Sequence, residues 1–369
     1  MKSYICAVGT ANPDHKVPQM QIAGFMAAAL QFDATDTRKL AALYRVSGID
    51  SRYTVLEDYA LQNGQFSFFP NTPDLEPFPS ISLRMQLYRK HALALSLKAI
   101  DDCLAREPQL KPDQLTHLIT VSCTGMYAPG LDIEIIEALE LPSAIERTAV
   151  NFMGCYAAFN ALKLANSICK ANPGANVLVV CTELCTLHFQ KSTETDHLVS
   201  NALFGDGAAA VWLSGEPKGR VNLELEAFHC ELLPAGKKDM AWHIGDFGFE
   251  MTLSAYIPEL IRGGIKHFSD RLLQQFQLQL SDIQWYAIHP GGRKILEAIE
   301  QELGISRTDN RFAYQVLRQF GNMSSVTVLF VLRALLDAVQ PENDGDRVLS
   351  FAFGPGLTME SMLLKVCHV

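Results

Sequence analysis

The stretch NFMGCYAAFNALKLANS, residues 151–167, guides the interpretation of the whole chain because it joins a tight turn to a helix start. Gly154 permits the turn, and Cys155 opens an Ala-rich helix. Unpaired N–H groups and the dipole at a helix start favour anions, so a thiol there loses its proton more readily. The stretch therefore predicts a nucleophilic cysteine, although a buried structural cysteine is the commoner explanation of such a pattern standing alone.

The second informative stretch is WYAIHPGGRKILEAIEQELG, residues 285–304, in which a strand-like run ends at His289. A Pro-Gly-Gly turn then leads into an amphipathic helix. Turns of this kind expose side chains at the carboxyl edge of a sheet, where α/β proteins usually carry out their chemistry. His289 can there pair with a thiolate and donate to an oxyanion, or simply bond to a backbone carbonyl.

The third stretch, YQVLRQFGNMSSVTVLFVL, spans residues 314–332 and places Gly321 and Asn322 just before a helix. Ser324 and Ser325 can cap that helix, so Asn322 has an ordinary explanation as a turn residue. Its amide also offers an uncharged donor to a developing enolate oxygen. Both interpretations stay open at this point.

Outward from these stretches, the chain alternates helical and strand-like segments, which predicts an α/β fold. Helical periodicity occurs in residues 22–32, 82–105, 155–170, 253–276 and 325–339. Short apolar runs of strand length occur in residues 117–123, 176–184, 208–214, 283–290 and 347–356. Gly, Pro and charged residues cluster in residues 214–222, so we predict an N-terminal half at 1–218 and a C-terminal half at 219–369.

Composition excludes several classes of protein. Of 369 residues, 48% are hydrophobic and 19% charged, which is typical of a compact folded chain. The net charge of -9 would repel polyphosphate strands, so we expect no nucleic acid partner. No export signal or membrane-spanning run is recognisable, and we place the protein in the cytoplasm.

The nine cysteines are scattered and odd in number, so reduced thiols are expected. Cys181, Cys185 and His188 are spaced loosely like metal ligands, but no second ligand pair follows them. We therefore predict no metal site.

Together the three stretches resemble the type III, chalcone synthase-like, polyketide synthases in their bacterial form. GCYAAFNAL, HPGG and FGNMSS look like that family's Cys, His and Asn signatures, in the same order. Three further segments extend the resemblance over nearly the whole chain: ALFGDGAAAV with a gatekeeper phenylalanine at Phe204, FAFGPGLTMESMLL at the C-terminus, and TGMYAPGLD near a dimer interface.

This resemblance implies a thiolase fold, layered αβαβα, with the nucleophile in the first half and His and Asn in the second. It also implies a homodimer, acyl-CoA and malonyl-CoA as substrates, no metal or organic cofactor, and possible delivery of the starter by an acyl carrier protein. Cys155 would carry the acyl chain, while His289 and Asn322 would stabilise the enolate formed from malonyl-CoA. Repeated extension and cyclisation would give alkylpyrones or alkylresorcinols.

The resemblance also suggests residues that shape the substrate site. Cys123 and Cys185 stand where plant members tend to have threonine, and Leu253 where they have a second phenylalanine. The more apolar pocket that results favours a medium or long aliphatic starter. Further substrate-binding residues are expected in the two glycine-rich turns: Gly291, Gly292, Gly354, Pro355 and Gly356. For the CoA phosphates the resemblance offers Lys39, Arg45 and Arg52, although two plant-type basic positions become Ala42 and Val46.

Three other functions are compatible with parts of the sequence. A ketoacyl synthase that initiates fatty acid synthesis would use the same three residue types and stop after one extension. A papain-like cysteine hydrolase also has Cys, His and Asn in this chain order, but its Cys-Gly-Ser-Cys-Trp pattern is missing. A non-catalytic thiolase-fold scaffold would retain the fold without turnover.

Overall fold

The computed structural model describes residues 1–369 and contains thirteen strands and ten α-helices. The strands are β1 (Tyr4–Ala11), β2 (His15–Pro18), β3 (Ser51–Thr54), β4 (His117–Ser122), β5 (Glu146–Asn151), β6 (Asn176–Leu184), β7 (Asp206–Ser214), β8 (Val221–Leu232), β9 (Met240–Gly245), β10 (Gly248–Leu253), β11 (Trp285–Ile288), β12 (Arg347–Gly354) and β13 (Thr358–His368). The helices are α1 (Gln19–Ala29), α2 (Ala34–Val46), α3 (Ile81–Arg106), α4 (Leu131–Ala138), α5 (Ala157–Ala171), α6 (Thr195–Leu203), α7 (Ile257–Gln274), α8 (Arg293–Leu303), α9 (Arg311–Phe320) and α10 (Thr327–Ala338).

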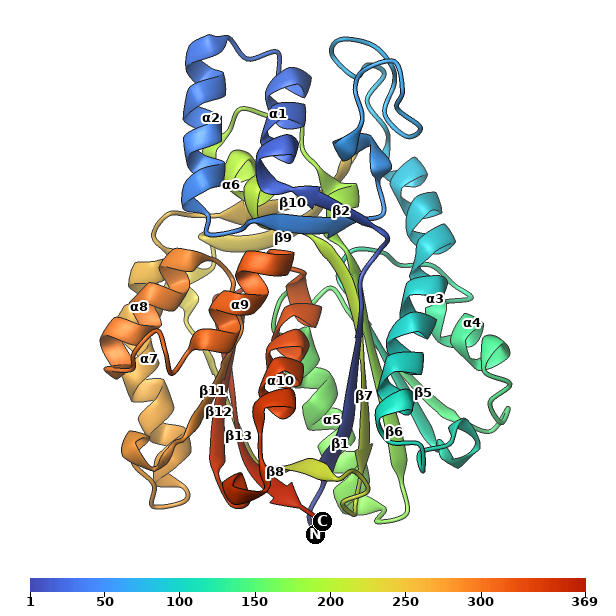
Figure 1. Ribbon diagram of the computed structural model, residues 1–369, viewed down its shortest axis with the longest axis vertical. Coiled ribbons are helices and arrows are strands. Elements are labelled where there is room, and N and C mark those ends of the chain that lie inside the picture. The colour runs from blue at the N-terminus through green and yellow to red at the C-terminus, as the bar shows by residue number, and fades with distance from the viewer.

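Strands and helices form five alternating layers (Figure 1). One nine-stranded mixed sheet runs in the order β11-β12-β13-β8-β1-β7-β6-β4-β5, and β8 joins its two wings by pairing with both β1 and β13. Helices α5 and α10 lie between the wings, α3 and α4 cover one outer face, and α7 and α8 cover the other. The αβαβα layering expected from the sequence is confirmed.

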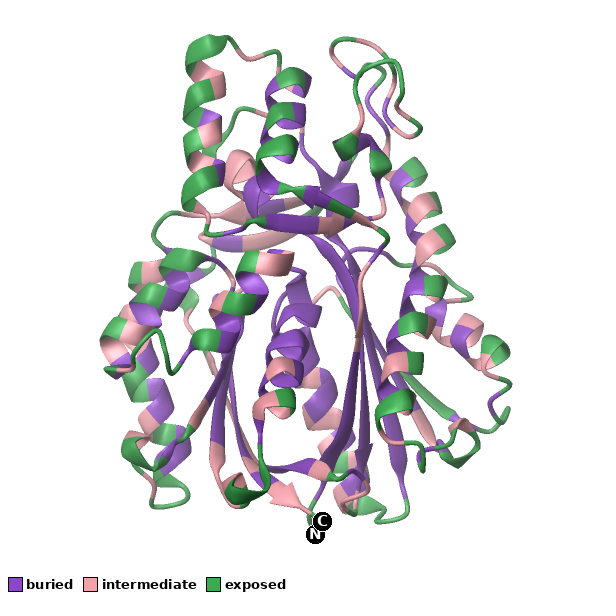
Figure 2. Ribbon diagram, in the orientation of Figure 1, coloured by how far each residue is buried: buried purple, intermediate pink, exposed green.

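Burial explains why the central strands contain unbroken apolar runs. Every residue of β6 and β7 is buried, which is typical of strands covered on both faces (Figure 2). Between the wings, α5 and α10 contribute Phe159, Leu162 and Leu329 to one apolar cluster together with strand residues of both halves. The ends of these two helices are therefore held rigidly at the junction of the halves.

A cap of smaller elements covers one end of the layers. It contains α1, α2, α6 and two short antiparallel strand pairs, β2–β3 and β9–β10, as Figure 1 shows at the top of the molecule. Both chain termini lie at the opposite end. The predicted division between residues 218 and 219 falls in the link between β7 and β8, and it stays a prediction.

Two differences from the sequence prediction concern local structure. The helix expected over 253–276 begins only at Ile257, because Leu253 ends β10 and pairs with Met240. Pro258 lies in the first turn of α7, where its missing N–H has no effect. Helix α2 was not predicted because its exposed surface is polar, and Asp33 caps it by accepting from the N–H groups of Thr35 and Asp36.

Candidate active site

Cys155 lies in the turn between β5 and α5, two residues ahead of the helix. Gly154 has a φ of 81°, and a side chain there would meet the ring of Pro355. The N–H of Gly154 donates to the Sγ of Cys123 at 2.9 Å. Cys123 and Pro355 therefore fix the turn that presents Cys155, and the tight turn predicted at Gly154 is confirmed.

Burial dominates the electrostatics of Cys155. The residue is 6% exposed, and desolvation raises the pKa of its thiol to about 12. Side-chain hydrogen bonding with Ser324 and Asn322 opposes this effect without cancelling it. The thiol of Cys155 therefore holds its proton until a base removes it, whereas the helix start alone suggested an easier ionisation.

His289 follows directly after β11 and is 1% exposed. Neither ring nitrogen has a hydrogen-bond partner, and burial lowers the pKa of the imidazole to about 3. A neutral imidazole offers one acceptor and one donor nitrogen. His289 is thus free to accept a proton and to donate a hydrogen bond within the same cavity.

Asn322 is held in one orientation by its neighbours. Its Oδ1 accepts from the N–H of Ser324 at 2.8 Å, which directs Nδ2 towards the Sγ of Cys155 at 4.0 Å. Nδ2 also donates to the carbonyl of Gly291 at 3.3 Å. Ser324 and Ser325 make no side-chain cap at this helix start, contrary to the sequence prediction. Instead the hydroxyl of Thr327 accepts from the N–H of Met323 at 2.8 Å.

Glu183, which the sequence did not single out, ties the surrounding segments together. It is completely buried, and burial raises the pKa of its carboxyl. The carboxyl accepts hydrogen bonds from the hydroxyl of Ser325 at 2.6 Å, the N–H of Cys123 at 2.9 Å and the hydroxyl of Thr124 at 2.8 Å. Glu183 therefore links the segment beside Cys155 to the segment that follows Asn322.

One enclosed cavity of about 10 Å³ collects the three predicted catalytic residues. Cys155, His289 and Asn322 all line it, although they come from β-strand and helix ends in both halves of the chain. Its remaining walls are mostly apolar: Phe204, Met240, Met251, Leu253, Gly291, Ile295 and Phe353. A cavity with mostly apolar walls strengthens hydrogen bonds to a developing negative charge.

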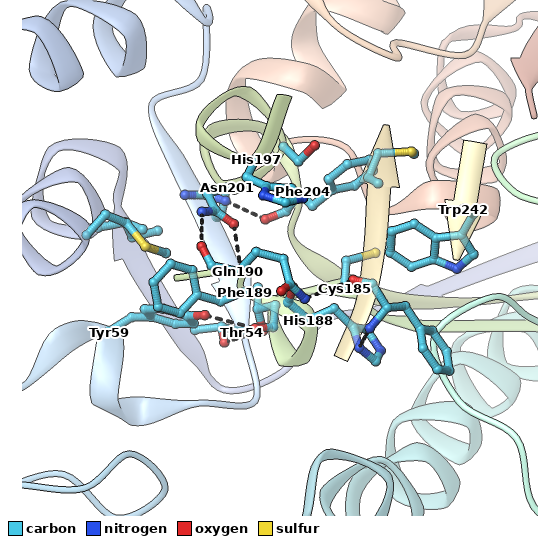
Figure 3. Close-up of a pocket in the computed structure, with 17 residues that line it drawn as sticks. Thr54, Tyr59, Cys185, His188, Phe189, Gln190, His197, Asn201, Phe204 and Trp242 are labelled. Carbon is cyan, nitrogen blue, oxygen red and sulfur yellow. Dashed lines mark hydrogen bonds between the residues drawn. The ribbon is translucent and has the colours of Figure 1, made fainter. Parts of the chain in front are cut away.

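A second pocket, of about 40 Å³, is drawn in Figure 3 and shares two lining residues with this cavity. Phe204 and Met251 line both spaces and so form the wall between them. Phe204 is joined to Asn322 by backbone pairing, because the N–H of Gly205 donates to the carbonyl of Asn322 at 2.9 Å. The wall and the amide of Asn322 are therefore held together by the backbone.

The second pocket combines apolar walls with a few buried polar atoms. Its apolar side includes Met26, Phe189 and Trp242, and the last of these donates from Nε1 to the carbonyl of Cys123 at 2.8 Å. Nη2 of Arg52 and Nδ1 of His197 are buried without a partner at its edge. The pocket thus suits an apolar chain that carries few polar groups.

The predicted substrate residues occupy three different places. Phe204, Leu253 and Gly291 line the catalytic cavity, and Cys185 lines the second pocket. The glycine-rich loop at Gly354, Pro355 and Gly356 instead packs behind the nucleophile, since a side chain at Gly354 would meet the ring of Tyr156. Gly292 precedes the first residue of α8 and is buried.

The three predicted CoA-binding residues do not form one cluster. Lys39 and Arg45 are exposed on α2, and Lys39 pairs with Asp36 at 2.8 Å. Arg52 is only 2% exposed, and its guanidinium donates to Oε1 of Gln19 at 2.9 Å and to the carbonyl of Phe204. Arg52 therefore supports the inner pocket and does not belong to a solvent-facing phosphate site.

Met251 is the residue that sequence reasoning missed at the wall. Leu253 lines the catalytic cavity alone, whereas Met251 lines both spaces beside Phe204. Both residues lie on β10, two positions apart, and therefore face the same side of the strand.

His188, whose spacing from Cys181 and Cys185 loosely resembles that of metal ligands, has both ring nitrogens engaged. They contact the carbonyl of Thr124 at 2.7 Å and the N–H of Phe249 at 3.0 Å.

Comparisons with known proteins agree with this geometry. Sequence models of chalcone and stilbene synthases match residues 1–217 with their N-terminal domain and residues 224–368 with their C-terminal domain. The chain is 32% identical to the alpha-pyrone synthesis polyketide synthase-like Pks18 of Mycobacterium tuberculosis, covering 99% of this chain and 91% of the relative. It is 30% identical to type III polyketide synthase A of Arabidopsis thaliana, covering 99% and 93%.

A solved structure shows the same fold. The C-terminal type III polyketide synthase domain of Steely1 from Dictyostelium superposes with a TM-score of 0.90 at 28% identity, and 99% of each chain is covered. This thiolase fold, with Cys, His and Asn around one buried cavity, defines a condensing enzyme. The chain belongs to the chalcone and stilbene synthase family and is a type III polyketide synthase, a malonyl-CoA-dependent acyltransferase.

Proposed function

We propose that this enzyme extends a medium or long aliphatic acyl-CoA with malonyl-CoA units and cyclises the chain to an alkylpyrone or alkylresorcinol. The observation that carries the proposal is the apolar pocket beyond the wall of Phe204 and Met251, which adjoins the cavity of Cys155. An alkyl chain gains free energy by leaving water for such walls. Pks18, which is named for alpha-pyrone synthesis, is a relative of this chain.

The first chemical step loads the starter on Cys155. His289 accepts the thiol proton as the sulfur attacks the thioester carbonyl, and it returns that proton to the departing CoA thiolate. Because burial raises the thiol pKa to about 12 and lowers the imidazole pKa to about 3, both groups start neutral. The proton therefore moves only as the new carbon–sulfur bond forms.

The second step forms the nucleophile from malonyl-CoA. As the carboxylate leaves as carbon dioxide, the electron pair moves onto the thioester oxygen and gives an enolate. Nδ2 of Asn322, fixed by the contact of its Oδ1 with Ser324, and the N–H of His289 can donate to that oxygen. The enolate then attacks the acyl group on Cys155 and releases the thiolate for the next cycle.

Chain length depends on how the wall side chains move. The two inner spaces measure about 10 and 40 Å³, so a growing chain fits only if side chains of the wall turn aside. Met251 is unbranched and flexible, whereas Phe204 is stiff and fixed beside Asn322. We therefore expect the side chain of Met251 to change its rotamer and make room for the growing chain.

We also propose a homodimer. The strand β5 forms one edge of the sheet, and most of its residues are exposed. An exposed edge strand offers unpaired backbone groups that a second subunit can cover. The loop with Ala128 lies beside this edge, because β4 pairs with β5 and continues into the loop. Light scattering that gave the mass of a single chain would contradict this proposal.

The CoA substrates imply no additional cofactor, and we propose that none is needed. No helix meets the length and hydropathy needed to cross a bilayer. Lys39 and Arg45 on α2 remain candidates for weak contacts to CoA. The family resemblance also allows an acyl carrier protein to deliver the starter.

The decisive experiment is mass spectrometry of products formed from malonyl-CoA and a chain-length series of acyl-CoAs. We expect pyrone or resorcinol products from aliphatic starters and none from the Cys155→Ala variant. Single-extension ketoacyl products would instead indicate a fatty acid initiation enzyme. A preference for an aromatic starter over every fatty acyl-CoA would contradict the aliphatic pocket.

A further inference from the structure

An open basic hollow, here called the arginine pocket, lies on the surface where α8 and α9 meet the turn after α2. Its volume is about 460 Å³, and its lining includes Arg293, Arg307, Arg311 and Arg318 together with Gly48. The whole chain has a net charge of -9. Four arginines around one hollow are therefore a local reversal of the overall charge.

The two arginines on the rim have acidic partners. Arg293 pairs with Glu297 at 2.7 Å, and Arg318 lies 3.8 Å from Asp50. All four of these side chains are at least 45% exposed, so water screens both pairs. Both arginines therefore stay available to an anion.

The other two arginines pair with no carboxylate. The guanidinium of Arg307 lies 4.1 Å from the ring centre of Tyr314, and that of Arg311 lies 4.4 Å from the ring centre of Phe312. Arg311 also donates to the carbonyl of Thr308 at 3.2 Å. Asp309, the nearest acid in sequence, accepts from Ser306 instead. Stacking on a ring holds a guanidinium flat and leaves its edge free to bind.

The arginine pocket is built on the elements that carry the catalytic residues. Arg293 begins α8, four positions after His289, and Arg318 lies in α9, four positions before Asn322. Gly291 lines the catalytic cavity and is only two residues from Arg293. The segments 289–293 and 318–322 therefore each contribute one end to the catalytic cavity and the other end to the arginine pocket.

We propose that the arginine pocket binds the phosphates of the CoA nucleotide while the thioester reaches Cys155. This inference rests on the proposed function. CoA carries a diphosphate and a 3′-phosphate at the end of a long flexible arm, so its charge is far from its reacting carbon. Arginine binds phosphate through two parallel hydrogen bonds, and four arginines match a ligand with several phosphate groups.

The shape of the site favours a small anion over a macromolecule. A hollow with stacked arginines can enclose a nucleotide, whereas an acidic carrier protein needs a broad convex or flat basic face. Around the hollow, Glu297 and Asp50 would repel an extended acidic surface. A carrier protein is therefore an outcome of the test and not the occupant that we propose.

The test compares two malonyl thioesters, malonyl-CoA and malonyl-N-acetylcysteamine, which lacks the nucleotide. In the double variant Arg307→Glu/Arg311→Glu we expect KM for malonyl-CoA to rise roughly tenfold to a hundredfold relative to KM for the short thioester, because charge-assisted hydrogen bonds are lost. Arg307→Lys/Arg311→Lys keeps the positive charge but lacks the paired N–H donors of a guanidinium, so it should cause a smaller rise in the KM ratio. Arg220→Glu, at an exposed site beside the C-terminal Val369, is the control and should leave the KM ratio unchanged.

Calorimetry with adenosine 3′,5′-bisphosphate tests the same pocket without turnover. We expect binding to the unaltered enzyme and to Arg220→Glu, and much weaker binding to the double glutamate variant. An unchanged KM ratio with unchanged nucleotide binding would overturn the inference. A defect confined to malonyl groups on a carrier protein would also overturn it. If the unaltered enzyme made no polyketide from either thioester, the proposed function would fail, while the calorimetry would still report on the pocket.

Discussion

The catalytic cavity and the arginine pocket are built from adjacent residues, yet they differ in nearly every physical property. His289 is 1% exposed in the cavity, whereas the side chain of Arg318 is 59% exposed at the pocket. The cavity holds about 10 Å³ and is lined mostly by apolar residues, while the pocket holds about 460 Å³ and four arginines. The turn before α8 and the turn after α9 lie between the catalytic cavity and the arginine pocket.

This difference shows how one scaffold handles a charged substrate with a neutral reacting centre. Inside, burial raises the pKa of Cys155 and lowers that of His289, so charge appears only during the reaction. Outside, arginines stay charged and can attract phosphates before the thioester enters. Mutations in the cavity should therefore change the rate of the reaction, whereas mutations in the arginine pocket should change the KM for CoA thioesters.

The largest effect is expected at Asn322. We predict that Asn322→Ala lowers the rate of malonyl-CoA decarboxylation by roughly a hundredfold to a thousandfold, as for loss of one preorganised oxyanion donor. The reason is that Nδ2, positioned through Ser324, no longer stabilises the enolate. Carbon dioxide release from labelled malonyl-CoA measures this rate.

An exposed asparagine provides the control for that experiment. Asn63→Ala removes an amide in the exposed loop between β3 and α3 and should leave decarboxylation unchanged. Retention of normal decarboxylation in Asn322→Ala, with the protein folded, would remove the amide from the mechanism.

The pH dependence of Cys155 reactivity distinguishes a neutral cavity from a preformed ion pair. Because burial raises the thiol pKa to about 12, the thiolate fraction at lower pH should grow about tenfold per pH unit. We therefore predict that alkylation of Cys155 by iodoacetamide, followed on its peptide by mass spectrometry, keeps rising from pH 6 to pH 9. A plateau in this range that disappears in His289→Gln would instead demonstrate a thiolate–imidazolium pair.

The wall between the two inner spaces should control starter length. We predict that Met251→Ala shifts the preferred acyl-CoA to longer chains, by roughly fourfold in kcat/KM for each added methylene at about 0.8 kcal/mol. The physical reason is that Met251 lines both spaces. Leu253→Ala, which enlarges only the catalytic cavity, is the comparison, and an identical shift in both variants would argue against a wall at Met251.

The smallest effect is expected on α2. Charge reversal at Lys39 or Arg45 should raise KM for acyl-CoA less than about twofold, because exposed charges are screened by water. Steady-state kinetics at low ionic strength measure this change. A rise larger than that from the double variant of Arg307 and Arg311 would place the phosphates on α2 instead.

Much of the fold and the grouping of Cys155, His289 and Asn322 could be predicted from the sequence. The strand ending at His289 and the turn at Gly154 are local patterns, and the structure confirms both. The meeting of Cys155, His289 and Asn322 at one cavity followed from the family resemblance, because residues 155, 289 and 322 are too far apart in the chain for local patterns to bring them together.

Side-chain environments could not be predicted in the same way. The family resemblance suggested a phosphate contact for Arg52, but the fold buries this residue within the cap and binds it to Gln19. Met251 and Leu253 both lie on one face of β10, and only the packing shows that Met251 reaches both spaces. The arginines of α8 and α9 are scattered in sequence and gather only because the two helices fold beside the turn at Gly48.

The most direct test of the central claim is a chase experiment on the acyl-enzyme. The protein is incubated with one fatty acyl-CoA, digested and analysed by mass spectrometry before and after malonyl-CoA is added. We predict an acyl group on the peptide of Cys155 that disappears as polyketide is formed. An acyl group on a different cysteine, or polyketide formation without any acylated Cys155, would contradict the assignment of this cavity as the site of condensation.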